Sequence, residues 1–222
     1  MEKLLSGYEW FRSRVYPYRE QSFLKLAHSQ APQALLITCA DSRIDPAMLL
    51  QCEPGDLFLC RNAGNIVPPH SSADGAGGCG VAATVEYAIE VLKIPEIVIL
   101  GHSDCGAMKG VLHPESLTDK PAVAKWLKHA ECARAVAGEH EATHDILRAV
   151  AQKNVETQIR HLESHPAVSA ALDRGALGLH GWYYDMPAGQ LHEFDSKAER
   201  FEPLNWTAVN QSAWLRTLRS AA

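Results

Sequence analysis

The sequence lacks an apolar stretch approaching the ~20 residues that a membrane-spanning helix needs. Its start, MEKLLSGYEWFRSRVYP, lacks the apolar core of a secretory signal and is interrupted by Gly7 and Arg12. An excess of basic residues is absent too, because the formal net charge is −5. We therefore expect a cytoplasmic protein that associates with neither a membrane nor nucleic acid.

No repeat, low-complexity tract or linker divides the chain. A length of 222 residues, 46% of them hydrophobic, is enough for one sizeable core. Six cysteines in a chain of this length, without a signal segment, are typical of reduced thiols in a cytosol. We expect a single domain over 1–222, with an N-terminal helical arm at 1–30 and the core at 31–200.

Short apolar segments alternate along the chain with segments of helical periodicity. Strands are predicted at 34–39, 57–60, 96–100, 177–185 and 190–194, and helices near the N-terminus and over 81–92, 121–137 and 144–164. Asp45 before Pro46 predicts another helix start, with Asp45 as the N-cap. Strands alternating with helices indicate an α/β fold, with a mainly parallel central sheet flanked by helices and an N-terminal helical arm.

Two predicted strands are followed at once by side chains that bind metals. Cys39 follows the apolar run at 34–38, and His102 and Cys105 follow the run at 97–100. Ligand sites in such sheets lie at the carboxyl ends of the strands, so the three side chains are expected to meet. Two thiolates and one imidazole suit zinc with an open fourth position, which is the arrangement of catalytic zinc sites.

Two charged residues accompany the first ligand. If the chain stays extended after the strand, Cys39 and Asp41 face the same spot, because residues two apart point to one side. Arg43 is then expected to hold the Asp41 carboxylate through its planar, two-pronged guanidinium. At the second segment, Gly101 is expected to end the strand and Gly106 to begin a helix.

These segments together resemble one known family. The sequence CADSR at 39–43 and GHSDCGAMKG at 101–110 resemble the two zinc-binding motifs of the β-class carbonic anhydrases. EPGDLFLCRNAGNIVPP at 53–69, VEYAIEVLKI at 85–94 and LHGWYYD at 179–185 are similar to other segments of that family. The resemblance runs from about residue 3 to about residue 200, and both motifs occur in the family's order.

The resemblance implies an activity and a set of residue roles. The expected reaction is the zinc-dependent reversible hydration of carbon dioxide to bicarbonate and a proton, with one Zn²⁺ per subunit. Asp41 would orient the zinc-bound hydroxide, or in a closed state act as a fourth ligand. Gln30, Phe58, Tyr87 and the backbone N–H of Gly106 would bound the substrate at a subunit interface. A homodimer or a higher homo-oligomer is therefore expected.

Two further expectations concern regulation and pH. Some family members bind regulatory bicarbonate through a tryptophan, an arginine and a tyrosine. Arg61 and Tyr184 occupy matching places, but Leu36 stands at the tryptophan position, so we expect this regulatory site to be absent. Two thiolates donate more charge to zinc than two imidazoles do. We therefore expect a weaker Lewis acid and an activity that rises toward alkaline pH.

Alternative interpretations of the same residues remain open. Hydrolysis of carbon disulfide or carbonyl sulfide needs the same hydroxide and a narrower entrance. A zinc-thiolate sensor or assembly module would have a closed fourth position and no hydration activity. Cysteines outside the motifs are interpreted as packing residues, namely Cys52, Cys60, Cys79 and Cys132.

Three patterns that resemble other sites are set aside. His140 to His144 spells H-E-x-x-H, but Gly138 and the charged residues nearby indicate a connection between helices instead. Gly75 to Gly80 spells a dinucleotide fingerprint, but no strand precedes it. His161 and His165 lie at a helix end, where cationic side chains suit the helix dipole.

Overall fold

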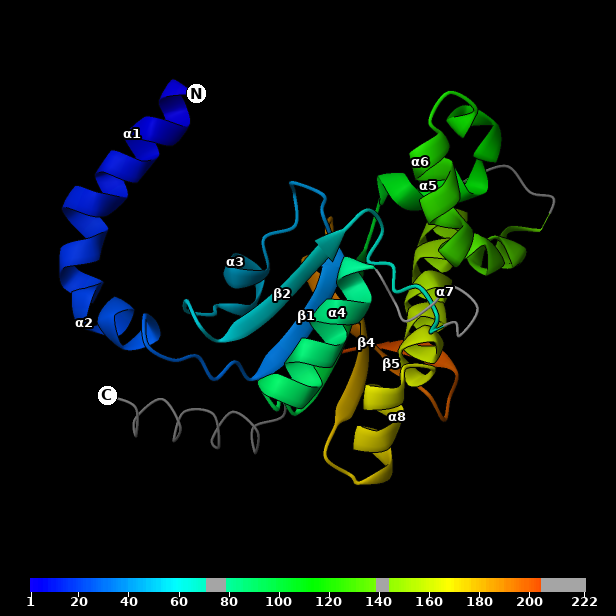
Figure 1. The fold of residues 1–222 in the computed structure, drawn as a ribbon. Helices are drawn as coiled ribbons and strands as arrows, with labels where there is room; N and C mark the ends of the chain where they lie inside the picture. The colour runs from blue at the N-terminus through cyan, green and yellow to red at the C-terminus, as the bar shows by residue number, and fades with distance from the viewer. Residues whose placement is uncertain (71–78, 139–143, 205–222) are drawn as a thin grey trace.

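The computed structural model describes residues 1–70, 79–138 and 144–204. In these residues a six-stranded sheet with the order β2-β1-β3-β4-β5-β6 forms the centre of the molecule (Figure 1). The strands are β1 (Ala34–Cys39), β2 (Leu57–Asn62), β3 (Glu96–His102), β4 (Gly178–Asp185), β5 (Gln190–Asp195) and β6 (Arg200–Pro203). The predicted α/β fold with a flanked central sheet is confirmed.

The first four strands of the sheet run parallel, and the last two are antiparallel additions. β1 pairs in parallel with β2 and with β3, and β3 pairs in parallel with β4. β5 and β6 follow as hairpin partners of β4 and β5. Parallel strands that are covered on both faces need apolar residues on both sides, which is why β1 and β3 are almost continuously apolar.

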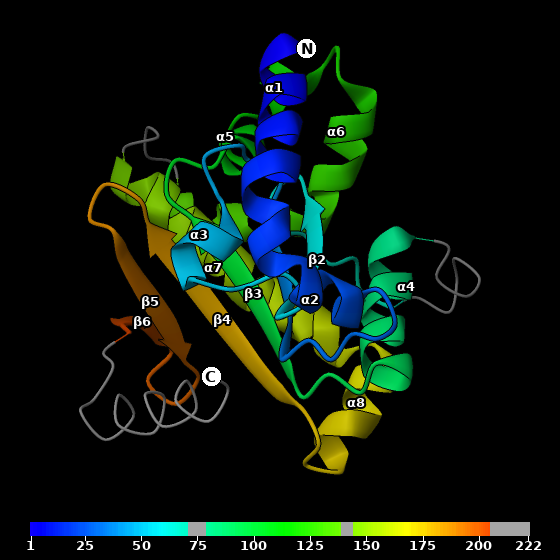
Figure 2. The ribbon, with the colours of Figure 1, turned by 90° about the vertical axis from the view of Figure 1, so that its left-hand side faces the viewer.

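Helices cover the two faces of the sheet unequally (Figure 2). One face packs Leu35, Ile37 and Ile99 against side chains of α4, α7 and α8. The other face packs Leu36 and Val98 against α3 and the loop before it. The helices are α1 (Glu2–Trp10), α2 (Tyr16–Leu26), α3 (Pro46–Leu50), α4 (Gly80–Glu86), α5 (Gly106–Leu112), α6 (Pro121–Leu127), α7 (His144–Glu163) and α8 (Pro166–Asp173).

Two predicted helices are built differently from a simple α-helix. The helix expected over 81–92 is α4, continued by a π-helical stretch at Tyr87–Val91. The helix expected over 121–137 ends as an α-helix at Leu127, and Lys128–Ala137 forms a 3₁₀ helix. α3 begins as expected, because the Asp45 side chain accepts a hydrogen bond from the backbone N–H of Met48 at 3.1 Å.

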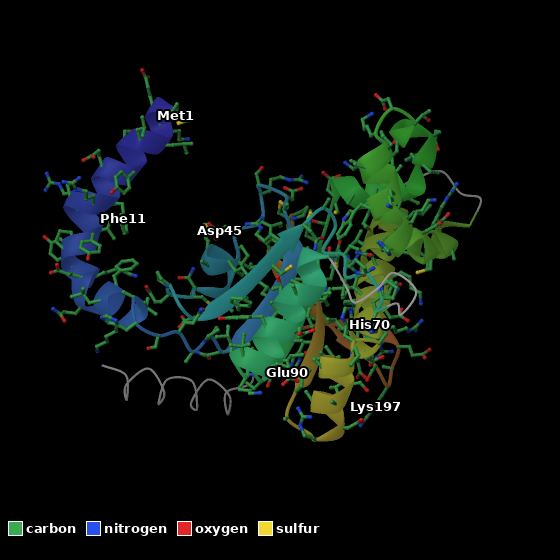
Figure 3. All side chains as sticks on the ribbon, in the orientation of Figure 1. Met1, Phe11, Asp45, His70, Glu90 and Lys197 are labelled. Carbon is green, nitrogen blue, oxygen red and sulfur yellow. The ribbon has the colours of Figure 1, made fainter. Side chains whose placement is uncertain are left out.

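The N-terminal helices lie apart from the sheet (Figures 1 and 3). α1, the π-helical stretch Phe11–Val15 and α2 contain no buried residue. Several large apolar side chains are exposed there, including Leu4 at 71%, Leu5 at 59% and Trp10 at 63%. Among the described residues, no helix is both long enough and apolar enough to cross a membrane.

Candidate metal centre

The carboxyl ends of β1 and β3 place two candidate ligands beside each other. Cys39 is the last residue of β1, and His102 is the last residue of β3. β3 therefore runs one residue beyond Gly101, the residue at which the sequence predicted that this strand would end. The two strands are neighbours in the sheet, and the buried Thr38 hydroxyl donates to the Leu100 carbonyl oxygen at 3.0 Å. Cys105 stands at the N-cap of α5, which begins at Gly106 as expected.

The three candidate ligands converge. The sulfur atoms of Cys39 and Cys105 and a ring nitrogen of His102 all lie within 4.8 Å of one another, and all three residues are buried. The two sulfur atoms are 4.0 Å apart. Two thiolates bound to one tetrahedral zinc would be about 3.8 Å apart, given Zn–S bonds of about 2.3 Å. Within the described residues, this is the one group of histidine, cysteine and acidic side chains with such geometry.

The His102 ring leaves one nitrogen for a metal. Its Nδ1 lies 2.8 Å from the carbonyl oxygen of Ser103, which only accepts, so Nδ1 carries the proton and donates. Its Nε2 is buried and has no hydrogen-bond partner. A buried nitrogen without a partner is costly. Metal binding would use its lone pair, and a donated Nδ1–H is the usual support of a metal-binding histidine.

The two thiols differ in how readily they ionise. The pKa of Cys39 is lowered to about 4, chiefly by the hydrogen bond from the Cys105 thiol, with further help from the Gly64 N–H. The pKa of Cys105 is raised, because its own ionisation would remove that hydrogen bond and add a second buried negative charge beside Cys39. One thiolate therefore forms easily, and the second needs a cation between the sulfur atoms.

Asp41 and Arg43 form the expected two-pronged pair beside the ligands. The Arg43 Nε donates to one Asp41 carboxylate oxygen at 3.0 Å, and its Nη2 donates to the other at 2.7 Å. The Arg43 side chain and backbone N–H together hold the pKa of Asp41 well below its usual range. Asp41 Oδ2 lies 4.0 Å from His102 Nε2, the nitrogen without a partner. Asp41 is therefore ionised and lies beside the candidate metal position, with both of its oxygens held by Arg43.

Asp104 is a member of this cluster that the sequence did not indicate. Its carboxylate accepts from Arg43 Nη1 at 3.0 Å, and its backbone carbonyl accepts from Arg43 Nη2 at 3.0 Å. Its other oxygen pairs with Lys109 Nζ at 2.5 Å. The only sign of this role in the sequence is the position of an acidic residue between the candidate ligands His102 and Cys105. A charged residue in a loop usually faces solvent, so this position alone did not predict a contact with Arg43.

Known proteins are similar to this chain over most of its length. The family model described as carbonic anhydrase matches residues 34–191. The solved structure of the β-carbonic anhydrase CcaA is 40% identical with a TM-score of 0.87, and the match covers 93% of this chain and 92% of that one. This chain belongs to the β-carbonic anhydrase family. Hydration of carbon dioxide is the general activity of the family.

Two other relatives extend this result. The carbonic anhydrase of Pseudomonas aeruginosa is 46% identical over 206 residues, which is 92% of each chain. A β-carbonic anhydrase of Sordaria macrospora, described as tetrameric, is 31% identical with a TM-score of 0.73, and the match covers 86% of this chain and 95% of that one. The resemblance predicted from the two motifs is confirmed.

The substrate residues predicted from the carbonic anhydrase motifs lie on separate elements. Phe58 of β2 and Tyr87 after α4 stack, with ring centroids 6.0 Å apart, and Tyr87 is 44% exposed. Gln30 is exposed in the loop before β1, and Gly106 is exposed at the start of α5. The structure thus brings the two aromatic rings together, and the substrate roles of all four residues remain predictions.

Arg61, which matches a regulatory residue of some carbonic anhydrases, binds the loop at 39–44 that contains Cys39 and Asp41. Its Nε and Nη2 donate to the Cys39 carbonyl oxygen, and Nη2 also donates to the carbonyl oxygens of Asp41 and Ile44, at distances of 2.8–3.1 Å. Leu36, at the tryptophan position, is 1% exposed in the core. The absence of the regulatory bicarbonate site remains a prediction, and these contacts agree with it.

The patterns that were set aside fall partly outside the described residues. Residues 139–143, and with them most of the H-E-x-x-H segment, are outside, as are residues 75–78 of the glycine-rich segment. His161 Nδ1 donates to the Val67 carbonyl oxygen, and His165 Nε2 donates to that of Pro68. His161 lies in the last turn of α7 and His165 just after its end, as expected, but burial lowers the pKa of both rings, which disfavours the cationic form.

The four cysteines outside the motifs have different surroundings. Cys60 is buried in the core, as expected of a packing residue. Cys79 is partly buried, and its sulfur accepts from the backbone N–H of Ala82 at the start of α4. Cys52 is partly buried, and burial raises the pKa of its thiol. Cys132 is exposed and is therefore not a core residue, although its sulfur lies 3.4 Å from the Thr157 hydroxyl on α7.

Proposed function

We propose that this chain hydrates carbon dioxide reversibly at a zinc ion held by Cys39, His102 and Cys105, with one zinc per subunit. The supporting observation is the convergence of three buried ligand atoms within 4.8 Å. The unpartnered Nε2 of His102 is the strongest part of it, because no other described group uses that lone pair. Three ligands leave the fourth tetrahedral position for solvent.

The zinc ion, Asp41 and Arg43 would each have a different role at this fourth position. Zinc with an open position is a Lewis acid that lowers the pKa of a water molecule bound to it. Asp41, ionised and acceptor-only, would take a hydrogen bond from that water and fix the direction of its free lone pair. Arg43 holds both carboxylate oxygens, which keeps Asp41 turned toward this role and away from the metal.

The substrate pocket is proposed to form where two subunits meet. Carbon dioxide is small and neutral, so aromatic rings and one or two hydrogen-bond donors are enough to bound it. The stacked Phe58 and Tyr87 supply the apolar wall, Gln30 supplies an amide, and Gly106 supplies a backbone N–H. The exposure of Tyr87 agrees with a contact made by a second chain.

We propose at least a homodimer, assembled through the N-terminal arm. An arm of three helical segments without a fully buried residue gains little stability from packing on the rest of its own chain. Leu4, Leu5 and Trp10 of the arm are apolar and exposed to water. Packing them against a second copy of the chain would remove this unfavourable exposure.

One variant tests the proposed catalytic role directly. Asp41→Asn keeps the shape of the side chain and removes its charge, so zinc content should stay near one per subunit. The hydration rate in a stopped-flow assay should fall by at least ~10²-fold, as for the loss of a group that handles a proton. Asp173→Asn changes an exposed carboxylate in α8 and serves as the control. An unchanged rate in Asp41→Asn would remove this residue from the mechanism.

The pH profile tests the ligand set. Because two of the three proposed ligands are thiolates, the wild-type rate should rise from pH 6 to pH 9. A flat profile over that interval would contradict a weakly acidic zinc site.

A further inference from the structure

Arg43 joins the two loops that carry the candidate metal ligands. Its guanidinium donates to both carboxylate oxygens of Asp41 in the first loop. It also donates to a carboxylate oxygen and to the backbone carbonyl of Asp104 in the second loop. We propose that Asp104 is a positioning residue for the hydration reaction, which fixes Arg43 and through it the orientation of Asp41.

The backbone of Asp104 is specialised for this contact. Its φ is +55°, a left-handed conformation that few residues other than glycine adopt, although aspartate and asparagine tolerate it. Asp104 lies between His102 and Cys105 in the sequence. Its left-handed backbone allows both its carbonyl oxygen and its carboxylate to accept from the Arg43 guanidinium. A residue held in an uncommon conformation by two charged contacts is well suited to set the geometry of a site.

Lys109, in the middle of α5, completes the arrangement. Its Nζ lies 2.5 Å from Asp104 Oδ1, while Arg43 Nη1 uses Oδ2. The two cations therefore each hold a different oxygen of the carboxylate, which restrains its rotation. With Asp104 in place, each of the two terminal guanidinium nitrogens of Arg43 has a partner in the second loop, and the side chain cannot turn without breaking both contacts.

The proposal rests on the proposed role of Asp41. Without the Asp104 carboxylate, Arg43 keeps its bonds to Asp41 but loses the contact that anchors Nη1. The Asp41–Arg43 pair then gains freedom to rotate, and Asp41 spends part of its time directed at the fourth metal position. This competes with solvent and with any added anion for that position.

Asp104→Asn removes the charge and one of the two acceptor oxygens, so the side chain can no longer hold Arg43 and Lys109 together. The risk to folding is small, because asparagine also accepts a left-handed backbone. We expect kcat to fall about 2- to 5-fold, the range of a partly exposed ion pair, with KM unchanged. Asp119→Asn, which removes an exposed carboxylate that pairs with Lys120, should leave kcat unchanged. A second readout uses the Co²⁺-loaded protein titrated with azide and followed by its visible spectrum. Competition by Asp41 should weaken azide binding about 2- to 5-fold in Asp104→Asn.

A double-mutant cycle shows whether Asp104 acts through Arg43. In an Arg43→Gln background, adding Asp104→Asn should change neither kcat nor azide binding further, because the shared contact is already lost. Equal losses in both backgrounds would overturn the proposal. So would unchanged kcat and azide binding in Asp104→Asn while Asp41→Asn is impaired. If Asp41→Asn itself keeps full activity, the proposed function fails instead, and the two failures are thereby distinguished.

Discussion

Gly101 allows helix α7 to lie directly on β3, one residue before His102. A methyl group at this position would lie 2.6 Å from Val155 Cγ2 and 3.5 Å from the backbone carbonyl oxygen of Ala151. Val155 is fully buried. β3 is paired on both sides, with β1 and β4, so the strand cannot move away. Gly101→Ala must therefore displace the helix or force the valine from its rotamer.

We expect Gly101→Ala to lower the free energy of unfolding by about 1–3 kcal/mol, the usual cost of overpacking a core. Urea unfolding at a fixed protein concentration measures this, since assembly contributes to apparent stability. Val155→Ala removes the nearest methyl group. The double variant should be more stable than the sum of the two single losses predicts, by at least about 1 kcal/mol. Because His102 follows directly, Gly101→Ala should also weaken metal binding. A stability change below about 0.5 kcal/mol, the level of an ordinary surface substitution, would refute the reasoning.

Two other predictions concern a charge cluster and the arm. Burial opposes protonation of His180, but its hydrogen bonds to Glu193 and Glu96 outweigh this and raise its pKa. The stabilisation is therefore complete below the unfolded pKa and disappears as pH rises through the folded one. His180→Gln should cost under about 1 kcal/mol at pH 6 and nothing at pH 9 in urea unfolding, and an equal cost at both values would contradict this. Replacing Leu4 and Leu5 by glutamate should dissociate the oligomer in light scattering, with Lys3→Glu as control; an intact oligomer would exclude the arm from the interface.

The sequence predicted the elements whose residues satisfy one dominant requirement. β1 and β3 are buried on both faces, so an uninterrupted apolar run was sufficient to place them. The metal-ligand candidates followed, because soft side chains directly after such strands are rarely there by chance. Asp45 and Pro46 gave the start of α3 because a helix cap depends on neighbouring residues alone.

The features missed by the sequence depend on long-range or weak local effects. β6 is a strand of four residues at the sheet edge, exposed at both ends, so it is too short for its polar and apolar alternation to stand out. The change from α-helix to 3₁₀ helix at Lys128 leaves the helical spacing of apolar residues nearly unchanged. The contact of Asp104 with Arg43 joins residues 61 positions apart, and neither residue type specifies its partner.

The terminal residues of two hydrogen-bonded strands supply Cys39 and His102, so the backbone ladder itself sets the distance between two corners of the coordination cage. In small zinc domains the ion assembles its own ligands, and its removal unfolds the chain. Here the candidate ligands Cys39 and His102 are placed by backbone pairing of β1 with β3, which needs no metal ion. Stripping with a chelator should leave an intact fold that recovers its cofactor from solution without refolding.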